Sequence, residues 1–181
     1  MQEQVANETT ALWRSFRFFM LCFAMEQSTL EHYFTFTLAS DIERINDTAP
    51  LWGKMNVQQM LEHVCLPFLI ATGKLPVPLT TPEEKVPVLK RILMSDKPLP
   101  RLFHNPLLPV EPVPAAGSHV QESKKALAET VLFFLEHFKN NPNATSVHNI
   151  YGPLNYHEWL VMNFKHIQHH FEQFGVEVAI R

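Results

Sequence analysis

The stretch that decides the fold is Asn155-Tyr-His-Glu-Trp-Leu-Val-Met-Asn-Phe-Lys-His-Ile-Gln-His-His-Phe-Glu-Gln-Phe-Gly175. It begins with a capping-box pattern, in which Asn155 accepts from a backbone N–H of the first turn and Glu158 reaches back to the cap. Apolar residues then recur at every third or fourth position, and glycine is a common residue at a helix end. The pattern predicts a helix from Asn155 to Gln173. Its expected core stripe consists of Leu160, Phe164, Ile167, Phe171 and Phe174.

Three histidines of this helix fall on different sides of it. Successive residues turn by about 100° around a helix, so His166 and His170 lie about 80–120° to one side of the core stripe, on adjacent turns. His169 points about 180° away and is expected in solvent. Two imidazoles one turn apart can converge on a single ion at about 2.0–2.1 Å each. The helix therefore offers one candidate chelating pair, His166 and His170.

A second helix begins at Asn56-Val-Gln-Gln59, another capping-box pattern, and is expected to run to about Lys74. His63 falls about 120° to one side of its core stripe, as the histidine pair does in the other helix. Pro67 lacks the N–H that would bond to the carbonyl of His63, so a kink is predicted just beyond His63. The stripe consists of Val57, Leu61, Val64, Phe68 and Ala71.

Two further long helices are predicted, over residues 28–47 and 118–140, the latter with an inner face of Val120, Ala128, Val131, Leu132, Leu135 and Phe138. Between the second and third long helices lies a proline-rich connection, Leu75 to Pro114, with a short helix expected from a cap at Thr81 to about Met94. So long a link lets the two helices that it joins run parallel. The predicted fold class is all-α: a four-helix bundle with up-down-down-up order and a long crossover between helices two and three.

The bundle domain is expected to cover residues 26–181, with residues 1–25 as an amino-terminal extension. Met25-Glu-Gln-Ser-Thr resembles a natural start, so residues 1–24 are interpreted as an upstream mis-start or a loosely attached extension. The apolar run Phe16 to Met25 is too short to span a bilayer. It could form a signal-peptide core, but Glu3 and Glu8 place acidic residues where such signals carry basic ones.

The composition of the chain argues against nucleic-acid binding and against a membrane span. A net charge of −3 gives no basic surface for nucleic acid, and no apolar run reaches the length of a membrane span. Cys22 and Cys65 form neither a metal-ligand pair nor a disulfide framework, so a reducing cytoplasm is the simplest setting. We therefore expect a cytoplasmic protein that acts on a small molecule, without nucleic-acid or membrane partners.

The residues alone do not decide whether these histidines bind a metal ion. A single histidine on a helix flank, such as His63, is more commonly a hydrogen-bonded boundary residue than a ligand. A His-x-x-x-His pair also occurs as two solvated side chains. The remaining histidines, at positions 32, 104, 119, 137, 148 and 157, have no paired spacing and are treated as background.

Two separated motifs carry a resemblance to a known superfamily. They are Trp52-Gly-Lys-Met-Asn-Val-Gln-Gln-Met-Leu-Glu-His63, and Tyr151-Gly-Pro-Leu-Asn-Tyr-His-Glu-Trp159 followed by Lys165-His-Ile-Gln-His-His-Phe-Glu-Gln-Phe-Gly175. Over roughly Gln27 to Gly175 the chain resembles the DinB-like superfamily, and within it a branch of unknown function. The resemblance implies an up-down-down-up four-helix bundle with a divalent metal held by His63, His166 and His170. Relatives include thiol-dependent S-transferases and an isomerase. The amino-terminal extension and the proline-rich crossover depart from the pattern.

Three neutral imidazoles would leave a metal ion with its full charge and an open position, as in catalytic sites. Such an ion would acidify a bound water, or bind a low-molecular-weight thiol cosubstrate as thiolate. Zinc and nickel are the leading candidates, and cobalt and iron also suit an all-nitrogen site. Gln59 and Gln173 are candidates to orient the imidazoles, and Trp159 is a candidate to line the pocket. The two glutamines could equally be solvated surface residues, and Trp159 a core or interface residue.

Two other residues near the predicted site are set aside. Glu62 is expected on the polar face of its helix, so it is discounted as a general base. Cys65 is expected to be a small buried hydrophobe rather than a nucleophile. The leading hypothesis is a metal-dependent transferase or hydrolase, and the alternative is a non-catalytic metal-binding or stress-response protein. A homodimer that packs through the aromatic segment Phe16 to Phe23 is compatible with both.

Overall fold

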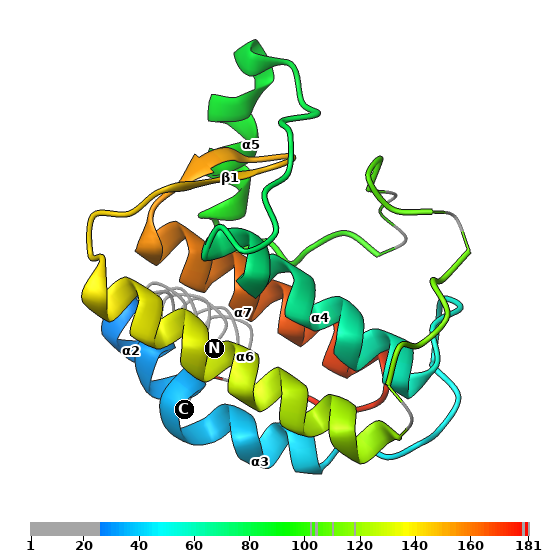
Figure 1. Ribbon diagram of the computed structural model, residues 1–181. Helices are drawn as coiled ribbons and strands as arrows, with labels where there is room; N and C mark the ends of the chain where they lie inside the picture. The colour runs from blue at the N-terminus through cyan, green and yellow to red at the C-terminus, as the bar shows by residue number, and fades with distance from the viewer. Residues whose placement is uncertain are drawn as a thin grey trace, which may run out of the picture.

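The structure is a computed structural model that describes residues 26–101, 103, 105–109, 111–117, 119–178 and 180. The described chain is predominantly helical, as predicted, with one small two-stranded sheet that the sequence analysis did not predict (Figure 1). The predicted extension, residues 1–25, lies outside the described residues together with the aromatic segment Phe16 to Phe23. No helix in the described part of the chain is both long and apolar enough to cross a membrane.

The first long helix consists of three consecutive segments. They are α2 (Gln27–His32), a π-helical turn η1 (Tyr33–Thr37) and α3 (Leu38–Glu43). The helix therefore ends four residues before the predicted Asp47. Asn46 explains the early end, because its side chain donates to the carbonyl of Arg44 and its own carbonyl accepts from Thr48. Asparagine commonly forms such local bonds in competition with the helix.

The two helices that carry the candidate ligands begin as predicted. In α4 (Val57–Ala71), the Asn56 side chain accepts from the Gln59 N–H, and the Gln59 side chain accepts from the Asn56 N–H. In α7 (Tyr156–Gln173), Asn155 and Glu158 form the same reciprocal pair. Both predicted capping boxes are confirmed. Pro67 lies inside α4, as expected.

The remaining long helix, α6 (Val120–Asn140), buries the predicted inner face except at Leu132. Phe134 is fully buried, whereas Leu132 is 59% exposed. Residues 131–135 read Val-Leu-Phe-Phe-Leu, so apolar side chains surround this part of the helix. Periodicity could not choose the inner face there, and contact with Phe68 of α4 decides it.

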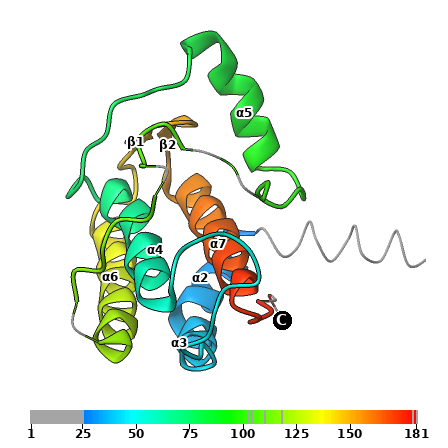
Figure 2. The same cartoon turned by 90° about the vertical axis from the view of Figure 1, so that its right-hand side faces the viewer.

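The long helices enclose one hydrophobic core. Helix α4 packs against α6 and α7, while α2 packs against α7 and α3 against α6 (Figures 1 and 2). Aromatic rings fill the centre, with Phe34 edge-on to Phe68 at 5.8 Å and Phe68 edge-on to Phe134 at 5.2 Å between ring centroids. Burying such rings is the main source of folding free energy.

The segment between α4 and α6 contains a short helix, α5 (Val86–Leu93), preceded by a 3₁₀ turn η2 (Glu83–Lys85). The predicted cap at Thr81 is wrong, because the Thr81 N–H donates to the Asn149 carbonyl and no cap bond forms. Asn149 follows the unpredicted sheet, in which β1 (Ser146–His148) pairs antiparallel with β2 (Gly152–Leu154). Gly152 has φ +70°, and a Cβ atom there would lie 2.8 Å from Val86 Cγ1. Glycine therefore lets the hairpin pack closely against α5.

The crossover is fastened to both helices that carry candidate ligands. On the α7 side, the Lys165 ammonium donates to the carbonyls of Leu93, Ser95 and Lys97. On the α4 side, the Gln59 side chain donates to the Val113 carbonyl, and the Glu62 carboxylate accepts from the backbone of residues 116 and 117. The middle of the crossover thus contacts the helix of His166 and His170, and its last part contacts the helix of His63.

Lys165 is only 4% exposed and supplies all three of its protons to backbone carbonyls. Burial lowers its pKa to about 8, so it remains charged at pH 7. We expect Lys165→Met to lower the free energy of unfolding by about 3 kcal/mol, because it leaves several carbonyls without their donor. Urea denaturation measures this change. The exposed Lys125→Met exchange is the control and should cost less than about 0.5 kcal/mol. Equal effects of the two exchanges would contradict the assignment.

Candidate metal centre

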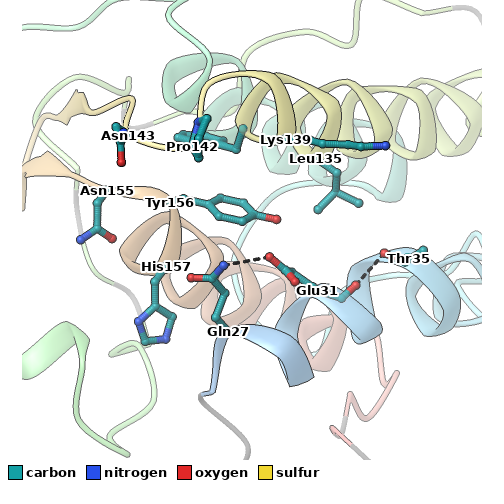
Figure 3. Close-up of a pocket in the computed structure, with 11 residues that line it drawn as sticks. Gln27, Glu31, Thr35, Leu135, Lys139, Pro142, Asn143, Asn155, Tyr156 and His157 are labelled. Carbon is teal, nitrogen blue, oxygen red and sulfur yellow. Dashed lines mark hydrogen bonds between the residues drawn. The ribbon is translucent and has the colours of Figure 1, made fainter.

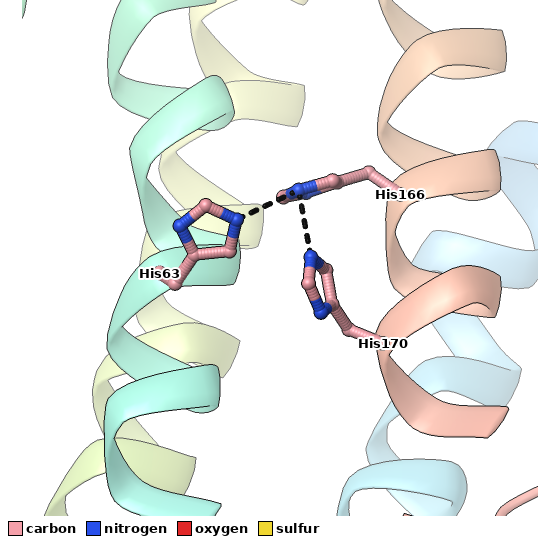
Figure 4. A group of neighbouring side chains, drawn as sticks. All are labelled: His63, His166 and His170. Atoms are coloured by element: carbon pink, nitrogen blue, oxygen red, sulfur yellow. Dashed lines mark hydrogen bonds between the residues drawn. The ribbon is translucent and has the colours of Figure 1, made fainter. Parts of the chain in front are cut away.

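Three histidine side chains meet between α4 and α7 (Figure 4). The Nε2 atom of His166 lies 3.0 Å from Nε2 of His63 and 3.1 Å from Nε2 of His170. One candidate ligand atom from each residue lies within 4.8 Å of the others. The structure thus brings together the lone histidine of the second long helix and the i, i+4 pair of the last one, as their positions on the helix flanks indicate.

The three imidazoles are neutral at pH 7. Burial lowers the pKa of His63 to about 4, and burial together with the neighbouring His63 lowers the pKa of His170 to about 3. Burial and the neighbouring histidines hold the pKa of His166 well below its ordinary value. Neutral imidazole is the form that binds a metal ion through a nitrogen lone pair.

Hydrogen bonds among the rings cannot satisfy this cluster. An imidazole nitrogen carries either one proton or one lone pair, so His166 Nε2 can make one good bond, yet it faces two other nitrogens. A cation would satisfy all three lone pairs at once. Two nitrogens about 2.05 Å from an ion and 3.0 Å apart subtend about 94° at it, between octahedral and tetrahedral angles. The donor set, and the spacing of the His63 and His166 nitrogens, therefore suit a divalent metal ion.

Gln173, named from the sequence as an orienting residue, contacts a candidate ligand. Its Oε1 lies 3.0 Å from Nδ1 of His170, and its Nε2 donates to the Trp52 carbonyl. An acceptor at Nδ1 places the imidazole proton there and leaves Nε2 free to bind a metal. Gly53 permits this approach, because a Cβ atom at that position would lie 2.4 Å from the Gln173 amide nitrogen.

The other two neighbours named from the sequence have different surroundings. Gln59 forms the capping box of α4 and donates to the Val113 carbonyl, and in the described structure no hydrogen bond joins it to His63. It holds the crossover rather than the ligand. Trp159 is fully buried, and its ring lies 5.5 Å from that of His148. Within the described structure, its ring does not stack on any of the three candidate ligands.

The expectation that His169 points into solvent is wrong. Its ring is half-buried, lies 6.1 Å from Trp52 and bonds to the backbone of Leu99, and burial lowers its pKa. Arg101 in turn stacks on Trp52 at 3.9 Å. The crossover covers the side of α7 that helix periodicity alone assigns to water. His169 is nevertheless outside the group of converging nitrogens, as expected.

Glu62 and Cys65 behave as the sequence analysis expected. Burial alone would raise the pKa of the Glu62 carboxyl, but N–H groups of Ala116 and Gly117 donate to it and hold its pKa below the ordinary value. The carboxylate thus anchors the crossover and does not face the histidines. Burial raises the pKa of the Cys65 thiol to about 11, and its Sγ donates to the Leu61 carbonyl. A thiol in this state is a poor nucleophile at pH 7.

His148, treated as background from the sequence, lies near the site. It is 7% exposed on β1, burial lowers its pKa to about 4, and it is one of the histidines that hold down the pKa of His166. No spacing rule reveals it, because it comes from a three-residue strand outside both ligand helices. Asn163 was also missed, although a polar residue three and seven positions before the two ligands of α7 shares their helix face.

A large cavity lies elsewhere, where α2 and the end of α6 meet the start of α7 (Figure 3). It has a volume of about 690 Å³ and is lined by polar residues that include Gln27, Glu31, Lys139 and Asn155. Tyr156 also lines it, and burial together with the Glu31 carboxylate raises the pKa of this tyrosine. The cavity includes none of the three histidines, so it is separate from the candidate metal centre.

Comparison of the chain with protein-family models, curated proteins and solved structures finds no match in any of the three.

Exchange of Gln173 for leucine should weaken metal binding about 10- to 100-fold, because His170 loses the acceptor that orients its ring. Competition against a chromophoric chelator measures this affinity. Gln168→Leu is the matched control on the same helix, since the Gln168 side chain donates to the Val178 carbonyl and, among the described residues, not to a candidate ligand. Unchanged affinity in Gln173→Leu would contradict the orienting contact.

The metal-free protein should lose stability as the pH falls from about 6.5 to about 4. Folded His63 and His148 have a pKa of about 4, below their value in the unfolded chain, so in this range the unfolded state binds more protons. Each contributes about 2 kcal/mol of destabilisation between pH 7 and pH 5. Urea unfolding of the chelated protein at both pH values checks this. His148→Asn should reduce the difference, and His32→Asn is the exposed control. A pH-independent stability would refute the prediction.

Proposed function

We propose that this protein is a divalent-metal-dependent enzyme whose metal ligands are His63, His166 and His170. The observation that carries the proposal is the convergence of three neutral imidazoles, in which Nε2 of His166 lies 3.0 Å from Nε2 of His63 and 3.1 Å from Nε2 of His170. Burying three such groups with their lone pairs facing one another is unfavourable without a cation to accept them. An arrangement of this kind is therefore expected at a site that binds a metal.

We further propose that the fold is the up-down-down-up four-helix bundle of the DinB-like superfamily. In support, α4 and α6 run in one direction in Figure 1, and α2–α3 and α7 run in the opposite one. The contacts α4 with α6, α6 with α3, α2 with α7, and α7 with α4 close a ring of helices around the core. The long crossover between α4 and α6 is what a parallel pair of consecutive helices requires.

The ligand set favours zinc or nickel, with cobalt and iron as further candidates. Three protein ligands leave at least one position open, so the bound ion would supply a Lewis acid that activates a water or thiol nucleophile near pH 7. Within the described residues no carboxylate joins the three histidines, and Cys65 is a buried neutral thiol. The nucleophile therefore has to come from solvent or from a cosubstrate.

The chain's own residues would orient the ligands and control access to them. Gln173 fixes the ring of His170, and the two crossover segments that Lys165 and Glu62 fasten contact both ligand helices. Such a site suits a small-molecule substrate, in a thiol-dependent S-transfer or a hydrolysis. We propose cytoplasmic thiol chemistry, since a low-molecular-weight thiol is available there in reduced form.

Elemental analysis of the purified protein tests the metal site. Wild type should hold one zinc or nickel ion per chain, whereas His63→Ala and His170→Ala should hold almost none, because two imidazoles bind a divalent ion far more weakly than three. His169→Gln is the matched control, since it changes the residue next to His170 outside the cluster. Full metal content in both alanine variants would refute the ligand assignment.

A second measurement separates an enzyme from a non-catalytic metal-binding protein. The metal-loaded protein is incubated with low-molecular-weight thiols and a panel of electrophiles and esters, and thiol consumption and product are followed. Turnover that disappears in His63→Ala supports the enzyme. Full metal content without turnover of any panel compound, with the metal serving only to raise the unfolding temperature, would favour the non-catalytic alternative.

A further inference from the structure

Four side chains of α7 form a continuous stripe beside the candidate metal centre. Trp159, Asn163, His166 and His170 follow one another at intervals of four, three and four residues. At about 100° per residue these positions fall within about 60° of one another around the helix. The stripe therefore runs from the two ligands toward the amino-terminal end of α7, where the β1–β2 hairpin lies (Figure 1).

Three members of this stripe carry buried polar atoms that have no partner among the described residues. They are Nε1 of Trp159, both side-chain polar atoms of Asn163, and Nδ1 of His166. Trp159 is 0% exposed and Asn163 is 1% exposed. Buried polar side chains are nearly always hydrogen-bonded in folded proteins, because an unpaired group loses its bonds to water without replacement. A run of such atoms along one helix face indicates a ligand-binding surface.

The hairpin adds a further donor next to this stripe. The backbone N–H groups of Ile150 and Tyr151 lie 3.1 and 3.3 Å from Nδ1 of His148, which must therefore be the accepting nitrogen. In the neutral ring the proton is then on Nε2. The ring lies 5.5 Å from that of Trp159. The hairpin thus holds His148 as a neutral hydrogen-bond donor beside the stripe.

The hydrogen-bond donors and acceptors of these side chains indicate which chemical group they would bind. Trp159, the Asn163 amide nitrogen and His148 offer N–H groups, whereas the Asn163 oxygen is the one side-chain acceptor in this described set. No carboxylate belongs to the stripe. A donor-rich, water-excluded surface next to a cation favours an anionic oxygen group.

We propose that Trp159, Asn163 and His148 form an oxyanion subsite that binds a carboxylate group of the substrate beside the metal. The assignment of this carboxylate to a metal-activated substrate rests on the proposed function. The subsite itself rests on the unpaired buried groups and can be tested without metal.

The test uses acetate as the probe and the chelated, full-length protein. Sodium acetate should raise the unfolding temperature of wild type more than sodium chloride of equal ionic strength does, because it binds only the folded state. Asn163→Leu should abolish this acetate-specific shift, and Trp159→Phe should weaken acetate binding about ten-fold. Gln168→Leu, on the same helix, is the control that keeps the wild-type shift.

A second readout distinguishes ligand binding from a structural role of Asn163. Without acetate, Asn163→Leu should unfold at the wild-type temperature or above, because it removes unpaired polar atoms from the interior. The subsite would be overturned if Asn163→Leu unfolds at a lower temperature than wild type. It would also be overturned if acetate does not shift the unfolding temperature of wild type, or shifts that of both variants as much as that of wild type. If Asn163→Leu does not fold, the acetate response of Trp159→Phe decides alone.

Metal content keeps the two proposals separate. Asn163→Leu and Trp159→Phe should bind cobalt like wild type, and acetate should change the visible absorption spectrum of cobalt-loaded wild type but not of Asn163→Leu. Loss of metal from wild type would refute the three-histidine site, while the acetate response of the chelated protein would still decide the subsite. An unchanged cobalt spectrum with a positive response in the chelated protein would overturn the placement of the carboxylate beside the metal.

Discussion

The removal of three imidazoles from water at the contact of α4 with α7 is the constraint on which this structure depends. Burial keeps His63, His166 and His170 neutral, and their lone pairs then meet at distances that hydrogen bonds cannot satisfy. Packing of the aromatic core supplies the free energy that holds the two helices in this arrangement. The fold therefore stabilises a site that is unfavourable by itself, as is common where binding or catalysis takes place.

The crossover has two functions in this arrangement. It connects α4 to α6, and it also supplies backbone groups that satisfy polar side chains next to the ligands. Lys165 precedes His166 in the chain and Glu62 precedes His63, and each binds backbone of the crossover. A segment without much regular structure is thereby ordered by contacts to charged groups of the ligand helices, which is a typical origin of order in long functional loops.

Features that depend on local sequence could be predicted, whereas those that depend on distant contacts could not. The capping boxes at Asn56 and Asn155 fix where α4 and α7 begin, and periodicity then places the three histidines on the helix flanks. The half-buried state of His169 depends on the backbone of Leu99, and the position of His148 depends on a hairpin too short to show a pattern. On α6, Leu132 was wrongly assigned to the buried face because apolar residues surround that part of the helix, so only packing selects Phe134.

The two capping boxes have a consequence for how this chain tolerates insertions and deletions. His63 is seven residues beyond Asn56 and His166 is eleven beyond Asn155, which correspond to about two and three turns. Each cap therefore sets the rotational phase of its ligand, and a single residue added between cap and histidine would turn the imidazole by about 100°, away from the others. Changes of length can accumulate in the connections without moving the ligands, whereas these two short intervals have to keep their length for the site to exist.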